Sequence, residues 1–188
     1  MRERILGVDP GTILMGFGII DQLQGSLDYV SSGVIKVKKS KEIGDRLIEL
    51  YDRLNQIIEK WQPNEIAIEA PFIPEQNIFG VTNKGSIKSA MAIGQAQGVA
   101  LMCAARNEIP CYLYPPTRVK NLVTGFGRST KDEMAGMVRI LLGIKDLKMG
   151  LDASDALAVA ICHSSDQRAR YNLGLAIGRA KHLINEQA

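Results

Sequence analysis

The sequence predicts a layered α/β domain, in which helices pack against a central sheet. Three observations support this fold class. Strand patterns fill the first part of the chain, an amphipathic helix then leads to a short apolar strand, and helical patterns dominate the remainder. With 188 residues, of which 46% are hydrophobic and 23% charged, the chain can bury a sizeable core. We therefore expect one domain over residues 1–188, with a C-terminal helix or tail over about 164–188.

Three strands open the predicted domain. Apolar runs with β-branched residues cover about 4–9, 15–22 and 26–37. Turn residues separate the runs, at Pro10-Gly11 and at Gln24-Gly25. Short turns between consecutive strands predict an antiparallel meander.

A helix then connects the meander to a fourth strand. Leucine and isoleucine recur at helical spacing over about 43–62, and Pro63 ends that pattern. The segment EIAIE, residues 65–69, is a short apolar strand, and a polar loop follows over about 73–84. Because a helix precedes this strand, we expect it to join the sheet in parallel.

Helices make up most of the remaining chain. The segment 86–108 is rich in alanine and glycine, so another helix can approach it closely, within the fold or across a dimer. A short strand at 111–114 follows, and a further helix is expected over about 130–143. The last helix begins near Asp152, and His163 is expected to end its apolar run rather than to bind a ligand.

The composition limits where the protein can act. No apolar run approaches the roughly 18 residues that span a bilayer, and the start MRERILGVDP shows no signal-peptide pattern. Three cysteines at wide spacing, without a CxxC pair, favour reduced and buried thiols over disulfides or zinc. These features predict a cytoplasmic protein that has no membrane association.

Positive charge gathers in the second half of the chain. Residues 115–148 contain seven lysines and arginines against three acidic residues, although the whole chain carries only +3. A basic segment suggests a polyanionic partner, although many such surfaces are only solvated.

Four acidic residues stand where acidity is unexpected. Asp9 and Glu69 each end an apolar strand, and Asp152 and Asp155 open an apolar helix at i, i+3 spacing, on one face. Taken singly, each has an ordinary explanation, such as a helix N-cap, a turn or a surface position. If the two strands are neighbours and the helix packs over them, all four carboxylates converge at one edge of the sheet.

Converging carboxylates repel one another unless a cation lies between them. Oxygen ligands without nearby histidine or cysteine favour Mg²⁺, or Mn²⁺ as a substitute, over zinc. Two such ions can activate water and stabilise the leaving oxygen when a phosphodiester is cleaved. The basic segment also suits a polynucleotide substrate.

The sequence resembles the RuvC family of bacterial crossover junction endodeoxyribonucleases, on motifs spread along nearly the whole chain. The matching segments are ILGVDPGT, GFGIID, AIEAPF, IGQAQGVAL, PTRVKNLVTGFGRSTKDEM and DASDALAVAICH. The resemblance implies an RNase H-like fold, with a mixed five-stranded sheet flanked by helices on both faces. It also implies a homodimer that nicks four-way Holliday junction DNA symmetrically with Mg²⁺ during recombination and repair, in partnership with the RuvA–RuvB branch-migration complex.

The resemblance also assigns roles to residues. The catalytic and metal-binding carboxylates are expected at Asp9, Glu69, Asp152 and Asp155. The expected DNA-binding residues are Phe72, which would stack on an unpaired base, and the basic residues Arg118, Lys120, Arg128 and Lys131. Their ordinary alternatives are a core phenylalanine and solvated surface charges.

The chain departs from the family pattern between Phe72 and Gly94, where it is longer. The additional residues, about 75–86, belong to a part of the chain that should approach the junction. They can alter sequence preference without touching the carboxylates, and we expect this loop to be mobile in the absence of DNA.

Three other functions compete with this one. Actin-like kinases share a similar DPGT phosphate loop, but they need a second phosphate loop and usually two domains. Another RNase H-like nuclease, acting on RNA or on flap DNA, would use the same carboxylates. A non-catalytic DNA-binding module would have the basic surface without four intact carboxylates.

Overall fold

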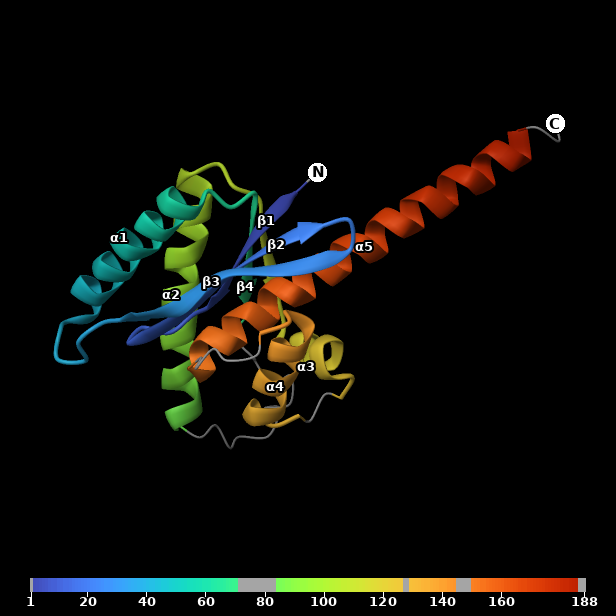
Figure 1. Cartoon of the computed structure of the whole chain (residues 1–188). Helices are drawn as coiled ribbons and strands as arrows, with labels where there is room; N and C mark the ends of the chain where they lie inside the picture. The colour runs from blue at the N-terminus through green and yellow to red at the C-terminus, as the bar shows by residue number, and fades with distance from the viewer. Residues whose placement is uncertain (1, 71–83, 127–128, 145–149, 186–188) are drawn as a thin grey trace.

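The computed structural model describes residues 2–70, 84–126, 129–144 and 150–185, and the side chains among them except those of 84–87 and of residues beyond 169. It contains a mixed five-stranded sheet with strand order β3-β2-β1-β4-β5, covered by helices on both faces (Figure 1). The predicted fold class is confirmed.

The first three strands form the expected meander. β1 (Glu3–Asp9), β2 (Leu14–Leu23) and β3 (Ser26–Lys36) pair antiparallel in chain order. β4 (Glu65–Glu69) lies parallel to β1, and β5 (Cys111–Tyr114) lies parallel to β4.

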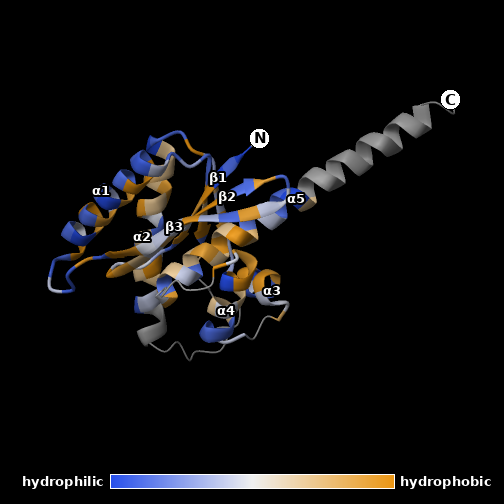
Figure 2. Ribbon diagram, in the orientation of Figure 1, coloured by the Kyte–Doolittle hydropathy of each residue, from blue (hydrophilic) through white to orange (hydrophobic). Residues whose placement is uncertain are grey.

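One face of the sheet is covered by two helices, α1 (Ile43–Trp61) and α2 (Lys84–Arg106). α1 is amphipathic: its buried side chains Leu50, Leu54 and Ile58 face the sheet, and its outer face is hydrophilic (Figure 2). The cluster that they join contains apolar residues of β1, β2 and β4, so this layer supports the strands from one side.

The opposite face carries α3 (Pro116–Thr124), α4 (Lys131–Leu141) and α5 (Leu151–Asn185). α5 runs across the sheet and continues well beyond it (Figure 1). No helix was predicted from the sequence over the segment of α3, which follows the strand at 111–114. Pro116 stands in the first turn of α3, where the missing N–H of proline has no helical partner to lose.

Glycines set the distance between α5 and the sheet. A Cβ at Gly7 would lie 2.0 Å from the carbonyl oxygen of Ala156, and one at Gly16 would lie 2.1 Å from that of Asp152. A Cβ at Gly18 would meet the Leu157 side chain at 2.6 Å. The helix therefore lies directly on the backbone of β1 and β2, which only glycine permits.

His163 corrects one expectation. It lies within α5 rather than at a helix end, and it is 1% exposed. Its Nδ1 lies 2.7 Å from the Tyr114 hydroxyl, and its Nε2 contacts the carboxylate of Glu65. If Nε2–H donates to Glu65, Nδ1 can accept a hydrogen bond from the Tyr114 hydroxyl, so both ring nitrogens have a partner.

The cysteines agree with the expected free thiols. Cys103 and Cys162 are buried, Cys111 is half-buried, and none forms a disulfide. Burial raises the pKa of both the Cys103 and the Cys162 thiol to about 12, so neither is a reactive thiolate at neutral pH. Within the described ranges, we find no helix with the length and apolar character needed to cross a membrane.

Candidate active site

The carboxyl ends of β1 and β4 bring the first two acidic side chains together. The strands pair in parallel with Val8 opposite Ile68, so Asp9 and Glu69 follow at the same edge of the sheet. Pro10 and Gly11 turn the chain away immediately after Asp9, which leaves the carboxylate at the strand end. A rigid sheet thus fixes two carboxylates side by side.

α5 supplies a third carboxylate from the opposite direction. Its first turns lie over β1 and β2, where Gly16 admits the backbone of Asp152. One turn further along, Asp155 projects toward Asp9 and Glu69.

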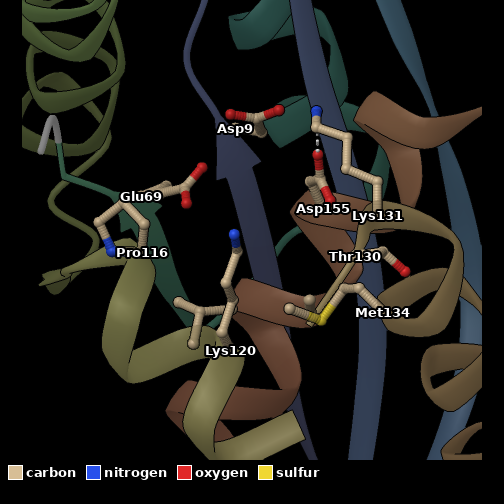
Figure 3. A pocket seen from close by; sticks show the side chains of 10 residues that line it. Asp9, Glu69, Pro116, Lys120, Thr130, Lys131, Met134 and Asp155 are labelled. Carbon is tan, nitrogen blue, oxygen red and sulfur yellow. Dashed lines mark hydrogen bonds and ion pairs between the residues drawn. The ribbon is translucent and has the colours of Figure 1, made fainter. Parts of the chain in front are cut away.

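These three carboxylates line a pocket of about 190 Å³. Its walls come from β1, β4, α3, α4 and α5, and Figure 3 shows acidic and basic side chains facing the same space. The lining residues are Asp9, Glu69, Pro116, Val119, Lys120, Thr130, Lys131, Met134, Asp155 and Ala158.

Asp9 and Glu69 are close enough to share a hydrogen bond, and their charges oppose each other. Burial and the neighbouring Glu69 raise the pKa of Asp9 to about 8, with a further contribution from Asp155. Burial also raises the pKa of Glu69, and the nearby Asp155 adds to this. The strand-end pair therefore holds a proton at neutral pH unless a cation takes its place.

Two lysines enter the same pocket from α3 and α4. The Lys131 ammonium pairs with the carboxylate of Asp155 at 3.0 Å, and this contact raises the pKa of the lysine (Figure 3). Lys120 points into the pocket, and its charge favours ionised Glu69 without a close ion pair to any described residue. The site thus combines clustered carboxylates with two cationic side chains.

The pocket also contains residues that sequence reasoning did not single out. Thr130 caps α4: it accepts a hydrogen bond from the N–H of Glu133, whose carboxylate in turn accepts from the Thr130 N–H. This capping box fixes the start of α4 and therefore the base of Lys131. The pattern TKDE was the available signal, since threonine three residues before glutamate is typical of such a start.

The other predicted site residues lie elsewhere or outside the described residues. Asp152 does not line the pocket, although its charge acts on Lys131. Arg118, on α3, pairs with Asp166 of α5 at 2.5 Å. Phe72 and Arg128 fall outside the described residues, as does most of the additional loop over 75–86.

The donor chemistry of the site fits a hard divalent cation. The oxygen donors of the pocket include three carboxylates. Two of them repel each other at the strand ends, and a cation between them would relieve this repulsion. Among the residues that the structure describes, no group of three or more His, Cys, Asp or Glu side chains already stands so that it could hold a metal. The Lys131 ammonium instead contacts the third carboxylate, that of Asp155.

Comparisons with known proteins agree with this geometry. The family model described as "Crossover junction endodeoxyribonuclease RuvC" matches residues 5–163. A protein of that name from Dehalococcoides mccartyi is 42% identical over 170 residues, which cover 90% of this chain and 95% of the relative. Another, from Porphyromonas gingivalis, is 38% identical over 190 residues, covering 98% of this chain and 95% of the relative.

A solved structure agrees as well. RuvC from Thermus thermophilus, in complex with a Holliday junction substrate, is similar with a TM-score of 0.76 and 28% identity. The similarity covers 89% of this chain and 96% of that one. Because the family model matches most of its length, this chain belongs to the RuvC family of crossover junction endodeoxyribonucleases.

Proposed function

We propose that this protein resolves four-way Holliday junctions by nicking two opposing strands during homologous recombination and DNA repair. The observation that carries the proposal is the cluster of Asp9, Glu69 and Asp155 in one pocket, beside two lysines, in a chain of this family. The similar Thermus thermophilus structure holds a Holliday junction substrate, which supports the same substrate class here.

The proposed cofactor is Mg²⁺, with Mn²⁺ as a substitute and two ions in each site. When bound, such ions supply Lewis-acid stabilisation of phosphoryl charge and an activated water. Asp9 and Glu69 would hold the ions from the strand ends, and Asp155 would join them from α5 once it leaves Lys131. Asp152 is the fourth proposed ligand, one helical turn before Asp155.

The lysines are proposed to act on the substrate. Lys120 and Lys131 flank the carboxylates, so a phosphodiester in the pocket meets a positive charge on each side. They would hold the scissile phosphate and balance the negative charge that grows on it as the bond breaks. Phe72, Arg118 and Arg128 remain proposed DNA-binding residues.

Symmetric nicking needs two active sites, so a homodimer is part of the proposal. Support comes from a groove of about 400 Å³ between α1 and α2, lined largely by apolar residues and the small Gly94 and Gly98. Ile48 and Met102, which line the groove, are exposed. A second copy of the chain could bury this surface. We further propose that the dimer works with RuvA–RuvB in the cytoplasm, where the free cysteines stay reduced.

The test is cleavage of a labelled, immobile four-way junction with Mg²⁺, beside linear duplex and flap DNA of matched sequence. Paired nicks at symmetric positions in opposing arms, on the junction alone, are the expected result. Preferential cleavage of flaps or of RNA hybrids would instead indicate another RNase H-like nuclease. Binding without metal-dependent cleavage would indicate a DNA-binding module.

A further inference from the structure

Phe126 is the most exposed large apolar side chain among the residues that the structure describes. It is 76% exposed, and it is the one aromatic residue among the exposed large hydrophobic residues of those ranges. It lies between the end of α3 and the start of α4. A single exposed apolar residue is ordinary by itself, so its setting decides whether it has a role.

The backbone holds Phe126 in this exposed position. Gly125 adopts the left-handed conformation at φ 77° and donates its N–H to the carbonyl of Asn121 at 3.0 Å. The N–H of Phe126 donates to Thr124 Oγ1 at 3.2 Å, and its carbonyl accepts from Ser129 Oγ at 2.7 Å. The turn is thus tied to both flanking segments at the aromatic residue itself, and its ring is presented to solvent.

The turn connects two helices that contribute to the wall of the proposed catalytic pocket. The helix before it carries Lys120, and the helix after it begins with Thr130 and Lys131, all three of which line the pocket. A nucleic-acid strand whose phosphate reaches the carboxylates between the two lysines would approach the turn that joins these two helices. Its bases would then be within reach of an exposed aromatic ring.

We infer that Phe126 is a base-stacking residue, which holds an unpaired or partly unstacked nucleotide beside the phosphate to be cut. This inference rests on the proposed function and deepens it, because it adds a substrate contact to the same site. An aromatic ring stacks on any base, so the contact would position the strand without reading a particular sequence.

A nucleic acid fits this surface better than a protein does. A protein docking site presents a contiguous apolar patch, commonly of several hundred Å². Here a single exposed ring lies on the turn between two helices that each carry a pocket lysine, and single-stranded nucleic-acid sites combine aromatic rings with cationic side chains. The described neighbours that contact the Phe126 backbone, Thr124 and Ser129, are polar and add no apolar area.

The test compares Phe126→Ala and Phe126→Trp with Ile140→Ala, a control residue on α4 that is 72% exposed and does not line the pocket. Binding to the four-way junction is measured in EDTA, so that no strand is cut. We expect Phe126→Ala to bind about five- to a hundredfold more weakly, and Phe126→Trp and Ile140→Ala to bind within about twofold of the parent. Unfolding temperatures should agree for all three variants.

Abasic junctions identify the stacked nucleotide. Single abasic sites are placed in turn at each position flanking the cleaved phosphate. At one position, the loss should weaken the parent protein as much as Phe126→Ala does, and the variant should lose nothing more there. This non-additivity would be absent if the ring had only a structural role.

The possible outcomes separate the two proposals. Equal junction binding by Phe126→Ala and the parent, with the parent still making paired nicks, overturns the stacking role and leaves the proposed function intact. Weaker binding that accompanies a change in oligomeric mass, with no abasic position that cancels it, assigns Phe126 to a protein contact and also overturns it. Failure of the parent to nick the junction overturns both.

Discussion

β4 begins and ends with a glutamate, and the two residues have opposite surroundings. Glu65, at the start, accepts hydrogen bonds from His163 and from Gln167 of α5. Glu69, at the other end of the strand, meets Asp9 and lies near Asp155. The strand and the two helical layers are the same for both residues, so the difference lies in the partners that α5 and β1 present.

The comparison separates a carboxylate that is satisfied by hydrogen-bond donors from one that lies among other carboxylates. Where a carboxylate holds the sheet to α5, the chain gives it neutral or cationic donors. At the pocket end the neighbours are other carboxylates, and burial together with these neighbours raises the pKa of Asp9 to about 8 and that of Glu69 above its usual value. In the absence of a cation, the carboxylates at the pocket end of β4 therefore repel one another, whereas Glu65 at the other end is satisfied by its donors.

The largest expected effect follows from removing one charge at the pocket end. Asp9→Asn keeps the size of the side chain but loses a proposed metal ligand. We expect junction cleavage to fall by about a thousandfold or more, because several kcal/mol of transition-state stabilisation would be lost. Junction binding in EDTA should stay within about threefold of the parent. Single-turnover cleavage and a binding titration measure the two quantities.

The control for Asp9→Asn is Asp28→Asn, an exposed aspartate on β3 far from the pocket. It should leave both cleavage and binding unchanged. Loss of folded circular-dichroism signal in Asp9→Asn, together with loss of binding, would mean that Asp9 has a structural role instead.

The second prediction compares substitutions at the two ends of β4. Glu65→Ala removes the acceptor of His163 and Gln167 and should lower the free energy of unfolding by about 1–3 kcal/mol. Glu69→Ala removes the electrostatic repulsion with Asp9 and should leave the free energy of unfolding unchanged or raise it. Urea denaturation in EDTA measures both variants.

Cleavage should show the reverse order for this pair. Glu65→Ala should cut at nearly the parent rate per folded molecule, and Glu69→Ala should be close to inactive. Equal stability losses in the two variants would contradict the division between a structural and a catalytic end.

The third prediction concerns pH. The pKa of Asp9 is about 8 in the folded protein against 3.8 as its ordinary value, so between these limits the folded state holds a proton that the unfolded chain has released. Its stabilising contribution is complete below about pH 4 and is lost as pH rises through about 8. Relative to Asp9→Asn, the metal-free parent should therefore lose several degrees of unfolding temperature across this window.

Thermal unfolding of both proteins in EDTA, at steps from pH 5 to 9, measures that difference. A repeat with saturating Mg²⁺ should flatten it, because the cation replaces the proton between Asp9 and Glu69. Parallel profiles for the two proteins in EDTA would show that Asp9 titrates normally.

The smallest predicted effect concerns the ion pair between Lys131 and Asp155. Lys131→Met frees a carboxylate and should raise affinity for Mn²⁺ by about two- to fivefold, since exposed ion pairs contribute little. Lys120→Met is the matched control, because Lys120 lines the same pocket without this pair, and it should raise affinity less. Calorimetric titration without DNA measures both, and equal gains would mean that the pair does not compete with the metal.

Much of the fold could be predicted from the sequence because its signals are local. The strand runs, their turns and the amphipathic spacing of α1 each depend on a few adjacent residues. The approach of Asp9 and Glu69 follows from the parallel pairing of two strands that each end in an acid, and that of Asp155 from the packing of the last helix over them. Their catalytic roles remain predictions.

The failures involve partners that are distant in the sequence. His163 was interpreted as a helix-end residue because its partners, Tyr114 and Glu65, lie 49 and 98 residues away. The spacing of Asp152 and Asp155 placed both on one face, but only the position of α5 over the sheet shows which of them lines the pocket. The helix α3 was not predicted; it is only nine residues long, and its signal in the sequence is the proline in its first turn.

The three glycines under α5 have a consequence for how this sequence can diverge. Every amino acid that could replace Gly7, Gly16 or Gly18 brings at least a Cβ, and at Gly7 and Gly16 that atom would lie about 2 Å from a helix carbonyl oxygen. Outward movement of the helix would carry Asp155 away from the strand ends. We therefore expect no substitution at these three positions to be neutral. Glycines that take no part in the proposed chemistry thus set the distance between α5 and the strand ends.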